Sequence, residues 1–317
     1  SYTAGVWYRR SDFDGVASPD AAGFTIGNKG YICGGYNGKT TRLADTWEYD
    51  IDNDWWTQRA DMPGTVRNAA TGFPVGNKGY ITTGYNPDQK YLADTWEYDP
   101  ETNTWRQMDD FKGGARYYAL GFGIDNYGYV GTGYNDNYLK DFYRFDPTAA
   151  AGSQWTIVNG FGGQKRQGGT AFVIDGKAYV CGGQNNNSDV SDFWRFDPSA
   201  ATPWTQLRDI ANTSDDDYDD DYTSIVRSYG VSFVIDGKAY LTLGSTAGGS
   251  YYSNYWIYDP ETDLWEGDDL TAFEGSTRIH AVCFSTGIRG IIATGGSGSS
   301  SYFDDTWELK PYEYEEE

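Results

Sequence analysis

The sequence predicts an all-β protein, a six-bladed β-propeller of four-stranded antiparallel blades, and three observations support this. A glycine recurs after β-type runs at six positions: Gly35, Gly84, Gly133, Gly183, Gly244 and Gly295. The spacings are 49, 49, 50, 61 and 51 residues, and a period near 50 is typical of one propeller blade per repeat. An acidic-aromatic phrase keeps step with these glycines, and stretches of helical periodicity are essentially absent.

The acidic-aromatic phrase has the form Asp-x-Trp-x-Tyr-Asp-Pro and is complete at 94–100. Its six copies begin at Asp45, Asp94, Asp141, Asp192, Asn254 and Asp305. The fifth copy has Asn in place of the first Asp, and the sixth lacks the closing Asp. A second Trp follows about ten residues later in five copies: Trp56, Trp105, Trp155, Trp204 and Trp265.

Each repeat divides into four short strands, as the second repeat illustrates. Alternating apolar residues predict strands over 69–75, 79–83 and 95–98, and a fourth centred on Trp105. The segment 99–103, Asp-Pro-Glu-Thr-Asn, predicts a hairpin loop, because Pro presets the turn and Asp and Asn side chains bond nearby backbone amides.

The sixth repeat lacks a second Trp, and a candidate lies at the other end of the chain. The segment 6–10 contains Trp7 and resembles the fourth strands of other repeats. If it pairs with the strand around Trp307, the ring closes and no exposed edge strand remains. The sequence therefore predicts closure by the N-terminal strand.

We expect one domain over 1–317, because propellers grow by adding blades. The expected blades span 18–62, 63–111, 112–161, 162–210, 223–270 and 274–311 plus 5–11, with an insertion at 211–222.

The glycines, the spaced aromatic pair and the period resemble kelch repeats, and the six-fold arrangement is similar to the propellers of the galactose oxidase-like and sialic acid mutarotase-like kelch group. The resemblance covers nearly the whole chain and implies the fold more strongly than a function, because propellers host unrelated activities. Similarity to exported kelch-like proteins implies export to a bacterial periplasm or cell surface. The copper site implied by galactose oxidase needs two histidines and is excluded, because the chain has only His280.

Composition limits the function classes further. The net charge of −22 argues against nucleic acids and anionic membranes, and no run of 18 apolar residues predicts a membrane span. No signal peptide is recognised. We expect a monomeric domain with three buried thiols, Cys33, Cys181 and Cys283, rather than a disulfide.

Blade topology predicts that the loops from strand four to the next strand one, and those from strand two to strand three, share one face around the channel. The first loop set carries five arginines, each six residues before a strand-one Phe: Arg67, Arg116, Arg166, Arg227 and Arg278. Blade one has Ser18 there instead. The guanidinium groups suit carboxylates, phosphates or sugar hydroxyls, or each bonds carbonyls and an Asp of the adjacent blade.

The second loop set carries an aromatic-amide pair directly after the repeated glycine. These pairs are Tyr36-Asn37, Tyr85-Asn86, Tyr134-Asn135 and Gln184-Asn185. Tyrosine faces beside amides suit sugar rings, while Asn after Gly is also an ordinary turn residue. Blades five and six diverge to Ser245 and Gly296, so the predicted site is asymmetric.

The longest spacing comes from an insertion with six carboxylates in seven positions, 215–221. Its alternate Asp residues are candidate Ca²⁺ ligands: Asp215, Asp217, Asp219 and Asp221. The spacing does not match an EF-hand, so we expect a solvated, mobile loop on the binding face that could serve as a lid or a docking element.

A last group of candidate residues, Glu274, Arg278 and His280, lies at the start of blade six. In a regular strand Arg278 and His280 share a face, and with Glu274 they could open and close a sugar hemiacetal. The alternative is a polar strand entrance with one packed histidine.

Together these features predict a non-catalytic binding protein for carbohydrate or a protein partner, without a cofactor. The alternatives are a cofactor-free sugar mutarotase or epimerase, and a structural scaffold of a surface complex.

Overall fold

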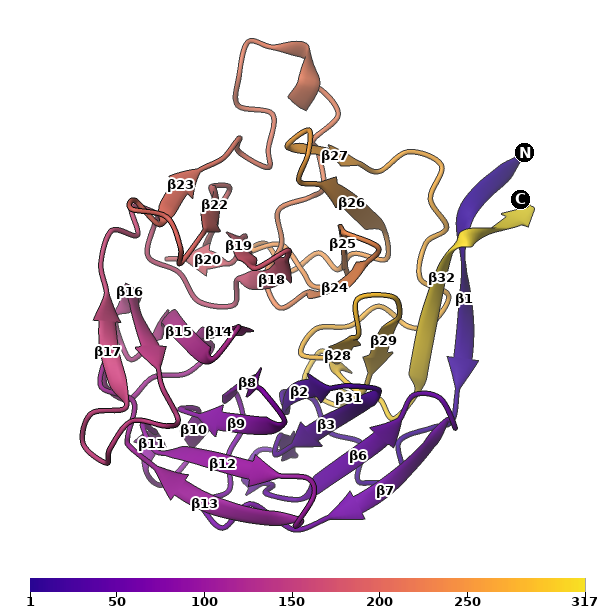
Figure 1. The fold of residues 1–317 in the computed structure, drawn as a ribbon. Coiled ribbons are helices and arrows are strands. Elements are labelled where there is room, and N and C mark those ends of the chain that lie inside the picture. The colour runs from indigo at the N-terminus through magenta and orange to yellow at the C-terminus, as the bar shows by residue number, and fades with distance from the viewer. Residues whose placement is uncertain (317) are drawn as a thin grey trace.

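The computed structural model describes residues 1–316, which form a ring of six four-stranded antiparallel sheets around a central channel (Figure 1). The first three sheets are β2 (Ala22–Ile26), β3 (Lys29–Cys33), β6 (Thr46–Asp50) and β7 (Trp55–Arg59); β8 (Thr71–Val75), β9 (Lys78–Thr82), β12 (Thr95–Asp99) and β13 (Thr104–Met108); and β14 (Leu120–Ile124), β15 (Tyr127–Tyr134), β16 (Tyr138–Phe145) and β17 (Trp155–Val158).

The remaining three sheets complete the ring. They are β18 (Thr170–Ile174), β19 (Lys177–Cys181), β22 (Phe193–Phe196) and β23 (Trp204–Gln206); β24 (Val231–Ile235), β25 (Lys238–Thr242), β26 (Tyr255–Asp259) and β27 (Leu264–Glu266); and β28 (Val282–Ser285), β29 (Gly290–Ala293), β32 (Thr306–Glu316) and β1 (Tyr2–Arg10). The predicted six-bladed, all-β architecture is confirmed, and we number the blades one to six in this order.

The N-terminal strand closes the ring, as predicted. β1 pairs antiparallel with β32, with Trp7 opposite Leu309 and Arg9 opposite Trp307, and the two strands run side by side in Figure 1. The Trp7 side chain is buried, packs edge-on against Phe273 with ring centroids 5.1 Å apart, and donates its indole N–H to the Thr271 carbonyl at 2.9 Å. Trp7 therefore replaces the second Trp that the sixth repeat lacks.

The core lies between neighbouring sheets and is built largely of the repeated aromatic residues. In one cluster Phe24 and Tyr31 of blade one pack with Ile81 and Tyr98 of blade two. The first strands of the blades approach closely around the channel. A Cβ on Gly72 would lie 2.3 Å from the Gly23 carbonyl oxygen, so this approach requires glycine.

The second repeat tests the strand predictions. Its second, third and fourth strands lie within one residue of the predicted positions, but the first begins at Thr71 rather than residue 69. The reason is Ala69, whose φ of 58° is left-handed and cannot continue a strand.

Short two-stranded hairpins follow the repeated glycines in five blades. They are β4 (Tyr36–Asn37) with β5 (Thr41–Arg42), β10 (Tyr85–Asn86) with β11 (Lys90–Tyr91), β20 (Gln184–Asn185) with β21 (Ser188–Asp189), β30 (Gly296–Ser297) with β31 (Ser301–Tyr302), and the extended ends of β15 and β16. In the described part of the chain no helix is long and apolar enough to cross a membrane. The three cysteines are free thiols, as expected, although Cys283 is only partly buried.

The insertion projects from the outer edge of the ring between β23 and β27, beyond the blades (Figure 1). It contains a 3₁₀ turn, η1 (Asp217–Asp219), and is anchored by Tyr222, which joins the core around Trp256 and accepts the Trp265 backbone N–H at 2.8 Å. The expected location on the channel face is therefore wrong, because an aromatic anchor ties the insertion to the rim. Five of its six Asp residues are exposed to solvent, as expected of a solvated loop.

Candidate ligand-binding face

The two predicted loop sets do meet on one face of the ring. In five blades an isolated bridge joins the strand-four-to-one loop to the segment after the repeated glycine of the same blade: Asn68 with Tyr85, Tyr117 with Tyr134, Gln167 with Gln184, Ser228 with Ser245, and Ile279 with Gly296. In blade one the Tyr36 backbone N–H donates to the Pro19 carbonyl at 3.2 Å. The hairpins and loops therefore form one continuous surface, which we call the mouth face.

The five repeated arginines lie inside this face rather than on it. Each is at most 1% exposed. Arg67 shows the common pattern, because it donates to both carboxylate oxygens of Asp94 at 2.7 Å and to the carbonyls of Thr65 and Thr83. Arg116 and Arg278 likewise donate to both carboxylate oxygens of Asp141 and Asp305, and Arg166 forms an ion pair with one oxygen of Asp192 at 2.5 Å. A ligand arriving from solvent cannot reach these groups, and the carboxylate partner belongs to the same blade rather than the adjacent one.

Two blades break the arginine–aspartate pairing. In blade five Arg227 donates to the neutral Asn254 amide oxygen at 3.1 Å and to three carbonyls, and its burial lowers its pKa to about 10. In blade one Ser18 replaces the arginine, and burial raises the pKa of the unpaired Asp45. By contrast, the hydrogen bonds and charge of Arg67 outweigh burial and lower the pKa of Asp94.

The asparagines of the second loop set also serve the blade. Each donates its side-chain N–H to a carbonyl 20 residues earlier: Asn37 to Ala17, Asn86 to Val66, Asn135 to Ala115 and Asn185 to Lys165. Their amides hold the two loop sets together, so these four candidate ligand-binding residues have a structural role in the described contacts.

The tyrosines of this set, in contrast, gather on the surface. Five partly exposed rings from blades two and three form a continuous cluster that we call the tyrosine platform: Tyr85, Tyr91, Tyr117, Tyr134 and Tyr138. Successive centroids lie 4.8–5.9 Å apart. Tyr36 of blade one contacts Tyr302 of blade six instead, and the Arg42 guanidinium lies over both Tyr36 and Tyr85.

A ring of six residues, two positions after each repeated arginine or its replacement, surrounds the channel axis. This inner ring is Asp20, Ala69, Tyr118, Gly168, Tyr229 and His280. All six have φ between 54° and 70°. Backbone N–H groups donate from blade to blade around the ring, as from Asp20 to the His280 carbonyl at 2.9 Å and from Ala69 to the Asp20 carbonyl at 3.0 Å. The left-handed backbone turns these side chains toward one another.

The inner ring closes the channel at this face. Tyr118 stacks on His280 with centroids 5.2 Å apart and planes inclined by 15°, and Tyr229 lies 4.5 Å from His280. A cavity of ≈ 240 Å³ begins directly beneath, lined by the first strands of all six blades. Gly168 is required here, because a Cβ would lie 2.5 Å from the Tyr229 ring.

A buried carboxylate organises the ring. Asp20 Oδ2 accepts from the Tyr118 hydroxyl at 2.7 Å and from the Asn68 amide at 2.6 Å, and Oδ1 lies 3.1 Å from His280 Nδ1. Arg42 donates in turn to Asn68 Oδ1 at 2.5 Å. Since a carboxylate only accepts, His280 Nδ1 carries the proton and Nε2 keeps its lone pair.

Burial sets the protonation states of this network. It lowers the pKa of His280 more than the neighbouring Asp20 raises it, so the imidazole is neutral at pH 7. Burial, together with the negative charge of Asp20, also raises the pKa of Tyr118 well above its usual value. The His280 imidazole and the Tyr118 phenol beside the Asp20 carboxylate are therefore both uncharged at pH 7.

The predicted group of Glu274, Arg278 and His280 is not assembled. His280 has φ of 59°, so the regular strand that would place it beside Arg278 is interrupted. Arg278 pairs with Asp305, and His280 faces Asp20. Glu274 is exposed and interacts with Glu315 on β32, which raises the pKa of Glu274. Only His280 belongs to the mouth face.

The candidate calcium ligands are likewise dispersed. Residues 1–316 contain no group of three or more His, Cys, Asp or Glu side chains placed to hold a metal ion. Asp219 is fully buried and accepts the backbone N–H groups of Thr213 and Ser214 at 3.0 and 2.8 Å, so this carboxylate caps its own loop.

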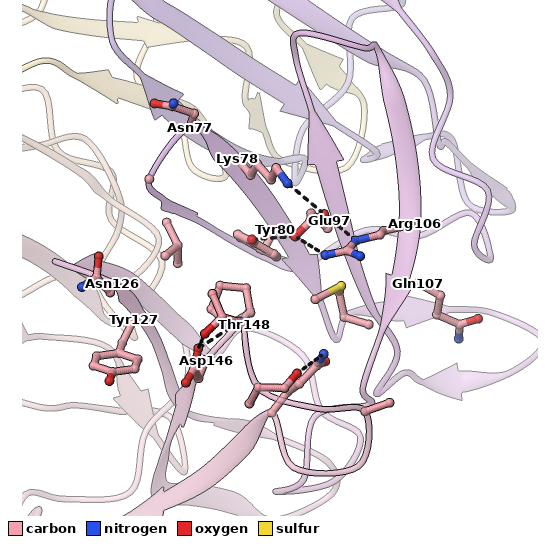
Figure 2. A pocket seen from close by; sticks show the side chains of 17 residues that line it. Asn77, Lys78, Tyr80, Glu97, Arg106, Gln107, Asn126, Tyr127, Asp146 and Thr148 are labelled. Carbon is pink, nitrogen blue, oxygen red and sulfur yellow. Dashed lines mark hydrogen bonds and ion pairs between the residues drawn. The ribbon is translucent and has the colours of Figure 1, made fainter.

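A groove of ≈ 950 Å³ lies between blades two and three, among the turns that join strands one to two and three to four. Figure 2 shows Lys78, Tyr80 and Arg106 gathered on Glu97, which accepts the Tyr80 hydroxyl at 2.8 Å and Arg106 Nε at 2.6 Å. The equivalent Glu48 accepts the Tyr31 hydroxyl at 2.7 Å. The cluster therefore occurs in blades one and two, and its charges are paired, so it stabilises these blades and does not mark the groove as a ligand site.

Five residues of this site were not predicted from the sequence: Asp20, Asn68, Tyr118, Gln167 and Tyr229. A signal existed, because aligning the repeats on the arginines places a polar or aromatic residue at one or both of the next two positions in every repeat. The alternation of apolar residues assigns these positions to the start of strand one, so they were not recognised as site residues.

Comparison with known proteins agrees with this fold. Residues 15–165 match the model of the KLHDC2/KLHL20/DRC7 Kelch-repeats domain, and residues 165–207 match the Kelch motif. No curated protein matches the chain. The solved structure titled "Structure of YjhT" aligns with a TM-score of 0.75 over 94% of this chain and 95% of its own, at 15% identity. In all, 770 chains of known structure match, so the fold by itself does not specify an activity.

Proposed function

Because the chain is a kelch-type β-propeller, a fold that suits a binding or scaffold role, we propose that it is a non-catalytic binding protein that recognises carbohydrate on its mouth face. The observation that carries this proposal is the tyrosine platform, five contiguous and partly exposed rings beside the polar inner ring. The other repeated polar residues of this face are committed to internal bonds.

The chemistry of the platform suits sugars. Tyrosine presents a flat apolar face with a polar tip, and a sugar ring offers C–H faces to stack and hydroxyls to bond. Tyr117 links the platform to the inner ring, because its ring centroid lies 4.5 Å from that of Tyr118. A site with aromatic walls and a few placed polar groups is the usual form of a small-molecule site.

Binding is tested by a glycan array followed by thermal-shift measurements on the array hits. We expect at least one glycan to raise the melting temperature, and Tyr85→Ala and Tyr134→Ala to remove that shift. The matched control is Tyr314→Ala, a 67% exposed tyrosine on β32, which should leave the shift unchanged. A shift that survives both platform substitutions, or an array without hits, overturns the proposal and favours a protein partner or a scaffold role.

One observation favours a second function, a cofactor-free sugar mutarotase. The neutral His280 is oriented by Asp20 and retains a lone pair on Nε2, the arrangement of a general base. It could take the proton of an anomeric hydroxyl while the ring C–O bond breaks and the ring oxygen is protonated by a donor or water. Closure on the opposite face of the carbonyl would give the other anomer and return the proton.

The enzyme is tested by NMR of a freshly dissolved single anomer. Faster equilibration that is lost in His280→Ala and retained in Glu274→Ala would support it. An equilibration rate equal to that of buffer excludes this second function.

A further inference from the structure

Polar atoms without partners gather at the inner ring near blades four and five. Gln167 is 8% exposed; its Nε2 donates to the Tyr229 hydroxyl at 3.0 Å, and its Oε1 has no partner among the described residues. Turning the amide over would pair Oε1 with the hydroxyl and leave Nε2 alone. Either way, one buried amide atom at the mouth is unsatisfied, and such groups are rare unless water or a ligand completes them.

Tyr229 points to the same conclusion. Its hydroxyl also accepts from Gln184 Nε2 at 2.9 Å, so with both amides donating, its own proton has no described acceptor. The His280 ring, whose centroid lies 4.5 Å from that of the Tyr229 ring, has a lone pair on Nε2, and the Tyr118 hydroxyl lies 3.5 Å from that nitrogen. Tyr229 and His280 of the inner ring, together with the neighbouring Gln167, thus present a donor, an acceptor and an amide side by side, which matches the adjacent hydroxyls of a sugar.

The charges at the mouth favour a ligand without a carboxylate. Asp20 is the one charged residue of the inner ring, and the five repeated arginines are buried. Arg42 donates to Asn68 and to the Lys39 carbonyl. The hairpin tips carry both positive and negative side chains, such as Lys90 and Asp136. They therefore do not reverse the preference for a ligand without a carboxylate. A ligand anion near Asp20 would meet like-charge repulsion in a partly desolvated site.

We propose that the mouth face binds the end of an uncharged oligosaccharide, with the terminal sugar over Gln167, Tyr229 and His280 and the following sugars stacked on the tyrosine platform. Tyr117 and Tyr118 make the two parts one continuous surface. This inference rests on the proposed carbohydrate binding. It adds the class of ligand, an uncharged oligosaccharide, and the orientation in which its terminal sugar lies over the inner ring.

Isothermal titration calorimetry with defined tetrasaccharides tests it. The neutral probes are the β-1,4-glucose, α-1,4-glucose, β-1,4-mannose and β-1,4-N-acetylglucosamine tetramers, and the acidic probe is the α-1,4-galacturonate tetramer. We expect at least one neutral tetramer to bind ten-fold or more tightly than the acidic one. Tyr229→Phe and Gln167→Leu should each weaken that binding about ten-fold. The control Tyr258→Phe, which removes a hydroxyl bonded to Asp263 in the β26–β27 turn, should have no effect.

The outcomes separate the inference from the proposed function. Equal binding of the acidic tetramer, or unchanged affinity in both Tyr229→Phe and Gln167→Leu, overturns the inference, while loss of binding in Tyr85→Ala would still uphold carbohydrate recognition. Unchanged affinity in Tyr85→Ala, or no binding of any tetramer, overturns both. As a charge test, Asp20→Asn should reduce the neutral-over-acidic preference at least three-fold, and an unchanged preference contradicts the role of Asp20. Melting curves of each variant verify that it is folded.

Discussion

At the scale of single residues, the arginine–aspartate pair shows why a repeated polar residue serves the blade. A buried guanidinium without an acidic partner is costly, and four blades supply a carboxylate from the start of their third strand. An ion pair with an Asp of the adjacent blade was one of two predictions for these arginines, and the observed Asp belongs to the same blade. Residue spacing could not decide between the predictions, because the burial of the arginine depends on how the loop folds over the strand. The two mismatched blades make the energetics testable.

Asp94→Asn should lower the free energy of unfolding by about 2–3 kcal/mol, because it leaves Arg67 buried and unpaired. The estimate stays below that for a fully buried pair because the Asp94 side chain is 22% exposed. Asp45→Asn should change it by less than about 1 kcal/mol, since Asp45 has no arginine to lose. Urea denaturation of both variants measures the difference, and equal losses would contradict the account.

Asn254→Asp should stabilise the protein by about 1–2 kcal/mol, because it gives Arg227 the carboxylate that the other arginines have. The same denaturation assay measures the gain. A variant less stable than the parent would show that the Ser224 hydroxyl, which accepts from the Asn254 amide at 2.8 Å, cannot rearrange around a second acceptor.

At the scale of elements, strand periodicity and turn residues were enough to place the strands of the second repeat. Its first strand, β8, buries alternate residues, and its second, β9, is a short apolar run that is buried along almost its whole length. The inner ring escaped prediction, because left-handed φ at Tyr118, Tyr229 and His280 depends on backbone bonds between blades distant in sequence. The position of the insertion was wrong for a similar reason. Tyr222 finds its partner 43 residues later, in β27.

The pairing of β1 with β32, which closes the ring, should contribute a large part of the free energy of unfolding. Trp7→Ala removes a buried indole and its hydrogen bond to Thr271 and should cost about 3–5 kcal/mol. The exposed Trp55 is the matched control, and Trp55→Ala should cost less than about 1 kcal/mol. Thermal and urea unfolding give both values, and similar losses would mean that β1 is not needed to hold blade six.

At the scale of the whole molecule, the paired carboxylates should make stability depend on pH. The pKa values of Asp94, Asp305 and Glu308 are lowered in the folded state, because hydrogen bonds and positive charges outweigh burial. The folded protein then binds fewer protons than the unfolded chain in acid. Their contribution is full above the unfolded pKa values near 4 and is lost as pH falls through the folded values.

The free energy of unfolding should therefore fall below about pH 4, and Asp305→Asn should show a shallower fall between pH 5 and pH 3. Urea unfolding at stepped pH measures both slopes. If the free energy of unfolding falls with the same slope in the parent and in Asp305→Asn, the acid sensitivity comes from groups other than the arginine–aspartate pairs. Relief of the repulsion from the net charge of −22 would act in the opposite direction and equally in both proteins.

The molecule as a whole repeats a stable blade and concentrates its differences at the mouth face. Blades two and three contribute tyrosines, and blades four to six contribute amides, a hydroxyl and the single histidine. The single histidine, His280, and the divergent segments at Ser245 and Gly296 were the signs of this asymmetry in the sequence. The sequence could not show that Asp20 and His280 meet, because 260 residues separate two positions that ring closure makes neighbours.

The central claim is that carbohydrate binds on the mouth face. A crystal structure with the tightest-binding tetrasaccharide tests it most directly. We predict electron density for sugar rings against Tyr85, Tyr117 and Tyr134, with the terminal sugar within hydrogen-bond distance of Tyr229 or Gln167. Density in the groove between blades two and three (Figure 2), or anywhere else away from the mouth face, would contradict the account.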